Sequence, residues 1–449
     1  MLRIQITSAA PGMTLAADIP GAAGAAAPLL RAGYRLTGSC IEKLRELKVR
    51  RVWVRFPRLD GAIESAAEET RRVQDLAANV MEDAVREVGA AVAPRLDYVR
   101  YDDVIRKLAE QVRDDTHAGM LVGELQAAGT ELAAHSAAVS FLALLLGVRL
   151  DAYLQGQRRH VGAAAAKHVQ NLGLGGLLHD VGLLRLEPAL RAAGERSPAG
   201  VFGAGVDKWR AHAEYGREMV HDYIAPTASA AIAHHHQRCD RSGFPSGARE
   251  DQPAVAPGDT EIHIFARIVA VADAFDAARR WDGEGARGRK MDEACHEVGG
   301  TPMVRTMSRL IARGVAGEFD GVVTRALGAI VPPFAPGSVI ELSTGAPAVV
   351  LEHNPRRPCR PRVQRIRCLA ALARLEDDCL AEVIDLARER DISVAASEGA
   401  EVGGDLYELY AKSERGMSAD ASAGSDAGIS DGGWMGPSPR EAPRFRPAA

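Results

Sequence analysis

The apolar residues in the middle of the chain recur with the spacing of a helix. Residues 121–148 are predicted to form one long helix rich in Ala, Val and Leu. Residues 169–177 and 267–276 are two further apolar runs of helical character. Residues 62–92 are rich in Ala, Glu and Arg with periodic apolar positions, which is typical of a helix that links two modules. We therefore expect the middle of the chain to be an all-α bundle.

Strand-like alternation is found on either side of this helical part. Residues 51–55 alternate like a half-buried strand and follow a short amphipathic helix at 41–47. Strands are also predicted at 338–342, 348–353 and 362–367, separated by Pro and Gly turns. The last residues are too rich in Ser, Gly, Asp, Ala and Pro to bury a core. The expected units are a small α/β module at 1–60, a helical linker at 61–117, a helical domain at 118–330, a β-rich extension at 331–400 and a disordered tail at 413–449.

Composition and charge limit the classes of partner. Hydrophobic residues make up 47% of the 449 positions and charged residues 25%, as in ordinary soluble proteins. A net charge of −4 provides no overall basic field for a nucleic acid polymer or an anionic membrane. The first residues lack a signal-peptide pattern, and the longest apolar run, 141–148, is too short to cross a bilayer. Six scattered cysteines without a C-x-x-C pair fit a reducing compartment. We expect a cytoplasmic protein.

Polar residues that interrupt the apolar runs are the candidate chemistry. His179 and Asp180 directly follow the run at 169–177. A buried carboxylate must be paired or bound to a cation, and imidazole with carboxylate suits a divalent transition metal. Such a pair alone is usually a structural hydrogen bond, so further ligands decide the matter.

Further candidates occur on both sides of this pair. Glu131 and His135 are four residues apart, which places them on one face of the helix predicted at 121–148. One His on an apolar face is most often a core histidine, but a Glu directly below it favours a ligand pair. The remaining candidates are His212, the run His234-His235-His236 and Asp273.

The order and spacing of these residues resemble the HD-GYP subgroup of the HD phosphohydrolase superfamily over residues 119–330. The family's H-D-x-G-K motif is matched by residues 179–182, with Leu183 in the place of the lysine. Its H-H-E-x-x-D-G-x-G-Y-P signature is matched by residues 235–245. The resemblance implies a mainly α protein, in which an HD-type helical bundle lies between the N-terminal α/β module and the β-rich C-terminal extension.

The resemblance also implies eight nitrogen and oxygen ligands, which are too many for one metal ion and suit two or three. Carboxylates and imidazoles without thiolates favour iron or manganese over structural zinc. Asp180 is expected to bridge two ions and, with His179, to be catalytic. The implied ligands are Glu131, His135, His179, Asp180, His212, His235, His236 and Asp273.

The activity implied by the resemblance is hydrolysis of the bacterial messenger cyclic di-GMP to the linear dinucleotide or GMP. Cyclic di-GMP is then the substrate, and GGDEF-type or other signalling proteins are expected partners. A homodimer stays open. The expected substrate-binding residues are Gly243, Phe244, Pro245, Arg279 and Arg280.

Departures from the family pattern leave alternatives open. Leu183 removes a cation that in the family contacts substrate phosphate, and Gln237 and Phe244 replace a Glu and a Tyr. The family's R-P-Y-[RK] stretch is lost after Asp276, where Arg279, Arg280, Arg287 or Lys290 could compensate. An active but weakened phosphodiesterase is favoured because every ligand is retained. The alternatives are a degenerate member that acts as a nucleotide receptor or protein-interaction module, and a hydrolase of another cyclic nucleotide.

Overall fold

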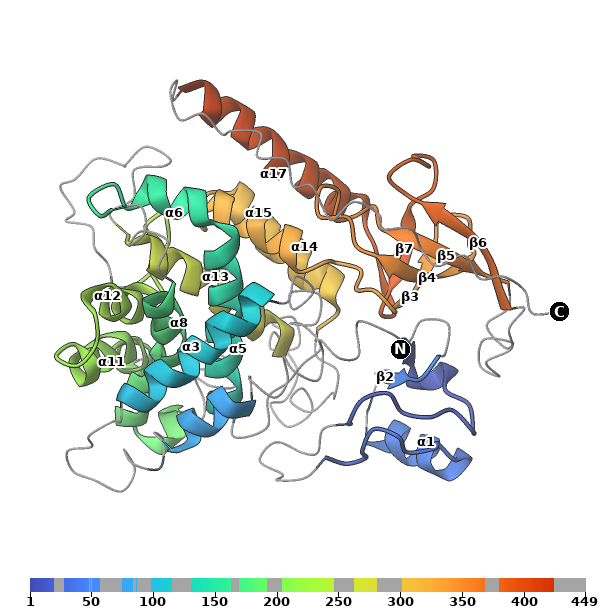
Figure 1. Ribbon diagram of the computed structural model, residues 1–449, viewed down its shortest axis with the longest axis horizontal. Coiled ribbons are helices and arrows are strands. Elements are labelled where there is room, and N and C mark those ends of the chain that lie inside the picture. Colours follow the sequence, from blue (N-terminus) through green and yellow to red (C-terminus); the bar gives the residue numbers. More distant parts are fainter. Residues whose placement is uncertain are drawn as a thin grey trace.

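The computed structural model separates a helical body from a β-rich region (Figure 1). We define the helical body as the helices from α3 to α15, the N-terminal module as the described residues up to 56, and the C-terminal sheet as β3 to β8. The structure describes residues 1–19, 28–47, 49, 51–56, 75–83, 86, 98–114, 131–162, 169–191, 204–245, 262–280, 301–367 and 379–423.

Two antiparallel strands and one helix form the N-terminal module. Strand β1 (Leu2–Gln5) pairs with β2 (Arg51–Val54), and the 3₁₀ helix η1 (Ile6–Ser8) follows β1. Helix α1 (Gly38–Glu46) begins after Thr37, whose hydroxyl accepts a hydrogen bond from the Cys40 amide. This agrees with the predicted small α/β module.

The helical body is built around α5 (Glu131–Arg149), in which every residue from 132 to 147 is buried. This helix is long and apolar enough to cross a membrane by length and composition, although 89% of its most hydrophobic window is buried inside the protein. It is therefore a core helix here. The surrounding elements are α3 (Tyr98–Asp114), α6 (Asp151–Gln157), α8 (Gln170–Leu178), η2 (Val181–Arg185), α10 (Ala204–Arg210), α11 (His212–Val220), α12 (Pro226–His234), α13 (Ile264–Arg280), α14 (Met303–Val315) and α15 (Gly321–Ile330).

Glycines allow α8 to lie close against α5. A Cβ on Gly176 would be 3.0 Å from the Cα of Ser140, and one on Gly173 would be 2.8 Å from a methyl group of Leu144. The Ser140 hydroxyl also donates to the Gly173 carbonyl at 2.8 Å. Because residue numbers rise along α5 as their partners fall along α8, the two helices are antiparallel. The C-terminal end of α8 therefore lies beside the first turns of α5.

The C-terminal sheet has six antiparallel strands in the order β6-β5-β4-β3-β7-β8. Ile340, Leu342 and Val350 belong to the main core, by which we mean the hydrophobic core of the helical body. This core also contains residues of α14 and of α17 (Gly404–Ala423). Val349 and Ile366 belong instead to the core of the N-terminal module. The sheet therefore packs between the helices and the N-terminal module. Its strands are β3 (Val339–Leu342), β4 (Pro347–Glu352), β5 (Arg362–Ile366), β6 (Leu380–Asp385), β7 (Val394–Ser397) and β8 (Ala400–Glu401).

The mainly α fold class with flanking β-structure is confirmed, but the start of the predicted tail is wrong. Helix α17 runs to Ala423, so residues 413–423 are helical rather than disordered. Leu406 and Tyr410 are buried in the main core and fix the first turns of this helix, from which it extends at little further cost. Residues 424–449 and most of the predicted linker at 61–117 lie outside the described residues.

Candidate metal centre

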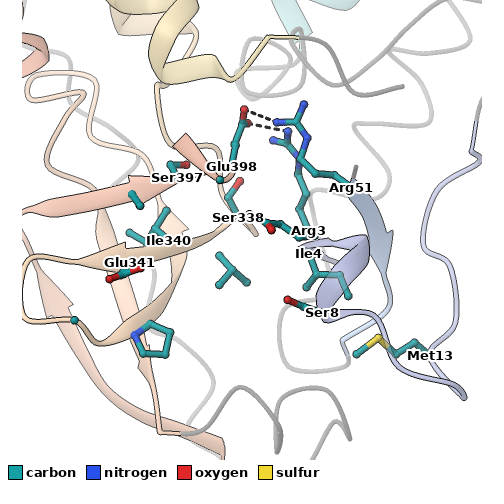
Figure 2. Close-up of a pocket in the computed structure, with 16 residues that line it drawn as sticks. Arg3, Ile4, Ser8, Met13, Arg51, Ser338, Ile340, Glu341, Ser397 and Glu398 are labelled. Carbon is teal, nitrogen blue, oxygen red and sulfur yellow. Dashed lines mark ion pairs between the residues drawn. The ribbon is translucent and has the colours of Figure 1, made fainter. Parts of the chain in front are cut away.

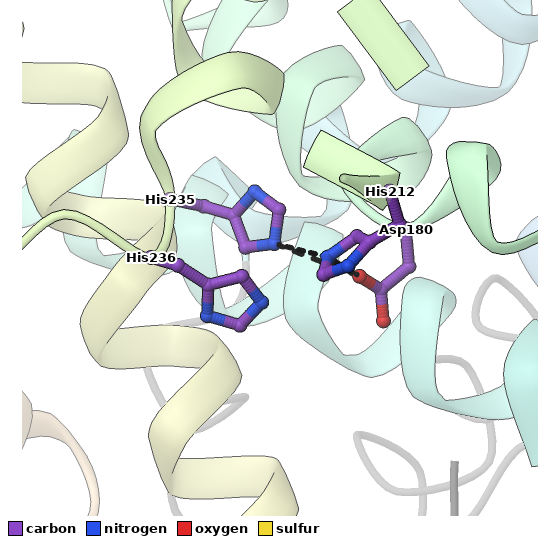
Figure 3. Close-up of side chains that lie close together, drawn as sticks. All are labelled: Asp180, His212, His235 and His236. Carbon is purple, nitrogen blue, oxygen red and sulfur yellow. Dashed lines mark hydrogen bonds and ion pairs between the residues drawn. The ribbon is translucent and has the colours of Figure 1, made fainter. Parts of the chain in front are cut away.

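Two groups of side chains meet at Asp180 inside the helical body. The first cluster is Asp180, His212, His235 and His236, and Figure 3 shows their side chains facing one another. The second cluster is His135, His179 and Asp180. Within each cluster, one nitrogen or oxygen atom per residue lies within 4.8 Å of all the others. Asp180 belongs to both, as expected of a bridging carboxylate.

Local structure brings the first cluster together. His179 and Asp180 follow the last residue of α8, and η2 then packs directly on α11. A Cβ on Gly182 would lie 1.9 Å from the carbonyl oxygen of His212 and 2.4 Å from the amide nitrogen of Gly216. Only glycine permits this approach, which places His212 at the start of α11 beside Asp180. The distance from His212 Nε2 to Asp180 Oδ1 is 3.3 Å.

Three histidines are held in the same way. In His179, His212 and His235 the Nδ1 atom lies 2.8, 2.6 and 2.7 Å from the carbonyl oxygen three residues earlier in the chain. An imidazole that donates from Nδ1 to a carbonyl leaves Nε2 as the acceptor or ligand atom. All three Nε2 atoms then lie within 3.6 Å of an Asp180 oxygen.

Helix α13 borders the second cluster. His135 Nε2 lies 3.3 Å from Asp273 Oδ1 and 3.9 Å from Asp180 Oδ2. On the opposite edge of the ring, Nδ1 lies 2.7 Å from Asp276 Oδ2, and Arg280 pairs with the same carboxylate. Asp276 therefore orients His135 in the way that carboxylates orient metal-binding imidazoles. Sequence reasoning did not assign Asp276 a role, although its spacing of three residues from Asp273 puts both on one face of α13.

The charges of this site are strongly coupled. Burial opposes the ionised form of Asp180, but the neighbouring imidazoles of His179, His212 and His235 outweigh it and hold the pKa of the carboxyl well below its usual value. Burial also opposes charge on His135, yet Asp273 and Asp276 raise its pKa to about 10. In the metal-free protein a proton on His135 thus supplies positive charge that the carboxylates require.

His235 and His236 of the first cluster differ electrostatically from His135. Burial lowers the pKa of His235, and burial together with His235 and His212 holds the pKa of His236 well below its usual value. These imidazoles are therefore neutral, the form that binds metal ions. The Nε2 atom of His236 is buried and has no hydrogen-bond partner among the described residues, whereas that of His179 lies 3.3 Å from Asp180 Oδ2.

Two predicted ligands lie at the edge of the clusters. Asp273 is buried, and its Oδ2 lies 4.0 Å from His236 Nδ1 in addition to its contact with His135. Glu131 is half-buried at the first position of α5, one turn before His135, and belongs to neither cluster of the described part. His234 is the last residue of α12 and also stands outside both clusters.

Residues predicted to bind substrate occupy different places. A Cβ on Gly243 would lie 2.1 Å from the His236 carbonyl oxygen, so the turn that ends at Pro245 packs tightly on His236. The Phe244 ring stacks on His236, with a centroid distance of 4.4 Å. Arg280 adjoins the site through Asp276.

Arg279 points away from the clusters. Its side chain donates to the Thr301 carbonyl and lies 3.8 Å from Glu398 of the C-terminal sheet. Arg279 and Arg280 face different partners because a helix directs consecutive side chains about 100° apart, and the role of Arg279 in substrate binding stays a prediction.

Leu183 is buried and forms an apolar cluster with Leu132, Leu186 and Trp209. The position where the family has lysine thus faces the hydrophobic interior in this protein. Trp209 connects this apolar cluster to the metal centre, since its ring centroid lies 4.8 Å from that of His212.

Comparison with known proteins agrees with this geometry. The family model described as the HD domain matches residues 132–278, a range that contains every residue of the two clusters. A curated cyclic di-GMP phosphodiesterase from Pseudomonas aeruginosa is 25% identical over 362 residues, which span 74% of this chain and 78% of that protein. The similarity therefore extends well beyond the matched domain.

Proposed function

We propose that this protein is a metal-dependent phosphohydrolase that cleaves cyclic di-GMP to the linear dinucleotide or GMP. The proposal starts from the match of residues 132–278 to the HD domain. The coarser activity follows from the HD domain and from the similar cyclic di-GMP phosphodiesterase. The substrate is our proposal, supported by the name of that relative.

A single contact carries the metal-dependent part of the proposal. The Nε2 atoms of His212 and His235 lie 3.4 Å apart, while each ring directs its Nδ1 to a backbone carbonyl. Two rings that donate only from Nδ1 point the lone pairs of their Nε2 atoms at each other, which is repulsive unless a cation lies nearby. The buried Nε2 atom of His236, which has no hydrogen-bond partner among the described residues, requires a cation for a similar reason.

The donor set fits two divalent ions that share Asp180. We assign His212, His235 and His236 to one ion and His135 and His179 to the other, with Asp273 beside both. Nitrogen and carboxylate donors without thiolates suit iron or manganese. Two such ions, when bound, lower the pKa of water toward neutrality and neutralise charge on the phosphate.

The protein's own side chains then orient the reacting groups. Asp276 and the three backbone carbonyls keep the imidazoles in fixed tautomers, so their positions need no reorganisation during the reaction. Phe244, stacked on His236, offers an aromatic ring at the edge of the site on which a base can stack. Arg280, paired with Asp276, is the nearest candidate cation from the predicted substrate-binding set.

Turnover of cyclic di-GMP by purified protein tests the proposal. The protein is freed of metal, reloaded with Mn²⁺ or, under anaerobic conditions, with Fe²⁺, and its products are separated by chromatography. We expect metal-dependent formation of the linear dinucleotide or GMP, and no formation by Asp180→Ala. Wild-type protein that binds metal but leaves cyclic di-GMP intact would contradict the proposed activity.

A second candidate function is a nucleotide receptor, and the burial of Leu183 is the observation that favours it. An apolar side chain in place of the motif lysine weakens the hold on phosphate, whereas it leaves the metal ligands in place. Binding of cyclic di-GMP without turnover would support this alternative. Hydrolysis of a different cyclic nucleotide under the same conditions would support an altered substrate.

A further inference from the structure

Glu398 occupies an unusual backbone position between two strands. It forms a two-residue turn with Gly399 that joins β7 to β8, where Ser397 pairs with Ala400. The φ angles of Glu398 and Gly399 are 56° and 78°, so both residues are left-handed. Hairpin turns of this kind strongly prefer Gly, Asn or Asp. A glutamate here is unfavourable for the turn, which points to a role for its side chain.

The Glu398 carboxylate joins three parts of the molecule. Its side chain is 5% exposed, and Oε1 lies 2.8 Å from a guanidinium nitrogen of Arg3 on β1. Arg51 on β2 pairs with Oε2, and the amide of Met303 donates to the same oxygen at 2.7 Å. Figure 2 shows Arg3 and Arg51 reaching toward Glu398 at one end of a cavity of about 390 Å³ between the N-terminal module and the C-terminal sheet.

The helical end of this contact is the junction of α13 and α14. Met303 is the first residue of α14, and Arg279 is the penultimate residue of α13. The amide of Thr301 donates to the Arg279 carbonyl at 2.9 Å, and the Arg279 side chain donates back to the Thr301 carbonyl. Because Arg279 also lies 3.8 Å from Glu398, one carboxylate holds the end of α13 and the start of α14 together.

Helix α13 connects this junction to the metal centre. Asp276 precedes Arg279 by three residues and Asp273 precedes it by six, which is about 4.5 and 9 Å along a helix. A regular helix transmits a shift or rotation of its end to these carboxylates. A small displacement there alters the contacts of His135, whose ring lies between Asp273 and Asp276.

We propose that Glu398 is a positioning residue that sets the end of α13, and with it Asp273 and Asp276, according to the placement of the N-terminal module. Arg3 and Arg51 belong to the N-terminal module and pair with Glu398, so a movement of the module moves the carboxylate. Arg279 and Met303 contact the same carboxylate, so its movement shifts the end of α13 and the start of α14. The effect on metal binding rests on the proposed function, whereas the effect on α13 does not.

Two substitutions of Glu398 test the proposal and differ in their risk to folding. Glu398→Gly removes the carboxylate while suiting the left-handed turn, and Glu398→Gln keeps the shape of the side chain without its charge. The matched control is Glu382→Gln on β6, whose carboxylate pairs with Arg365 on the same sheet but is 55% exposed. Exposed pairs of this kind contribute little to stability.

The first measurement is amide hydrogen exchange of the full chain without metal. We expect Glu398→Gly and Glu398→Gln to raise exchange in residues 273–280 and 303–306 by roughly five- to ten-fold, with no change in Glu382→Gln. Added formate should slow exchange in Glu398→Gly, because it can replace the carboxylate between the arginines. Wild-type exchange of α13 in both Glu398 variants would overturn the proposal.

The second measurement is the affinity for Mn²⁺ by calorimetry, together with turnover. Both Glu398 variants should bind Mn²⁺ roughly five- to ten-fold more weakly than wild-type protein, although no metal ligand is altered. Unchanged affinity in variants with loosened α13 would overturn the link to the metal centre. Failure of wild-type protein to bind Mn²⁺ would count against the proposed function, and hydrogen exchange would still decide the role of Glu398.

Discussion

At the scale of single residues, the geometry of the metal centre depends on how closely η2 and α11 approach each other. A Cβ on Gly182 would lie 1.9 Å from the His212 carbonyl oxygen, which is backbone and cannot give way locally. We expect Gly182→Ala to lower the free energy of unfolding by about 3 kcal/mol or more and to weaken metal binding. Chemical denaturation and metal titration provide the measurements.

Gly156 provides a matched control for this substitution. It lies in α6, and a Cβ there would meet nothing within 4 Å. Gly156→Ala should be neutral or stabilise by up to about 1 kcal/mol, because alanine is the better helix former. Equal effects of the two substitutions would show that the close approach at Gly182 is unimportant.

His135 gives the metal-free protein a defined dependence on pH. Asp273 and Asp276 outweigh burial and raise its folded pKa to about 10, above the value of about 6.5 in an unfolded chain. The protonated ring therefore stabilises the fold fully below about pH 6.5, and this contribution is lost as the pH rises through about 10. Across that window the melting temperature of metal-free wild-type protein should fall more than that of His135→Asn.

Affinity for metal should change in the opposite direction over the same window. A metal ion needs the unprotonated Nε2 of His135, so proton release accompanies binding and affinity rises with pH. His221→Asn is the control for the pH dependence of both melting temperature and metal affinity, because His221 is exposed at the end of α11. A melting curve of His135→Asn that falls with pH as steeply as that of wild-type protein would contradict this assignment.

At the scale of elements, η2 packs against α5 and α10. This packing turns position 183, where the family has lysine, toward the apolar interior. Leu183 is only 3% exposed and packs with Leu132 and Trp209. Leu183→Lys would place an amine in this apolar cluster and should destabilise the protein by roughly 1–3 kcal/mol. Leu183→Met keeps the volume and should cost less than about 1.5 kcal/mol. Thermal unfolding of the two variants checks the difference.

Turnover gives the same variant a second readout. We expect Leu183→Lys to leave kcat/KM unchanged or lower at matched metal content, because the cluster directs position 183 into the interior. An increase in kcat/KM would show instead that the amine reaches the substrate phosphate. The weakened activity expected from the sequence would then be due to this one side chain.

The sequence predicted the secondary-structure elements and the motif histidines better than it predicted the direction in which each side chain of a helix points. His179, His212, His235 and His236 were recognisable because their spacing follows a motif, and a motif fixes local geometry. Arg279 and Arg280 are adjacent in sequence, yet one faces Glu398 and the other Asp276. That difference is set by the packing of α13 between the metal centre and the C-terminal sheet, which no local pattern contains. Helix α17 was missed for a similar reason, since its first turns are fixed by burial of Leu406 and Tyr410.

At the scale of the whole molecule, the order of the modules was predictable but their contacts were not. The N-terminal module and the C-terminal sheet are more than 280 residues apart in sequence, yet they share one hydrophobic core that includes Leu2, Val54, Val349 and Ile366. Patterns of apolar residues show that each strand has a buried face, but not which distant surface covers it. The Glu398 contact with β1 and β2 belongs to this long-range packing.

Metal ions should stabilise the molecule as a whole because their proposed ligands come from separate parts of the helical body. These ligands lie on α5, after α8, on α11, after α12 and on α13, so unfolding of any one of them releases the ions. At a metal concentration about 100 times the Kd, binding adds about 2.7 kcal/mol to the free energy of unfolding. For a large domain this corresponds to a rise in Tm of roughly 5–10 °C.

Scanning calorimetry of the metal-free and Mn²⁺-loaded protein measures this rise. Asp180→Asn is the matched control, since it changes the one carboxylate common to both clusters while nearly preserving its volume. We expect Mn²⁺ to raise the Tm of wild-type protein and to leave that of Asp180→Asn almost unchanged. Because the ligands hold five segments around one centre, the shift should appear in the main transition of the helical body. Equal shifts in both proteins would place the stabilising ion elsewhere and would contradict the assignment of Asp180 as the shared ligand.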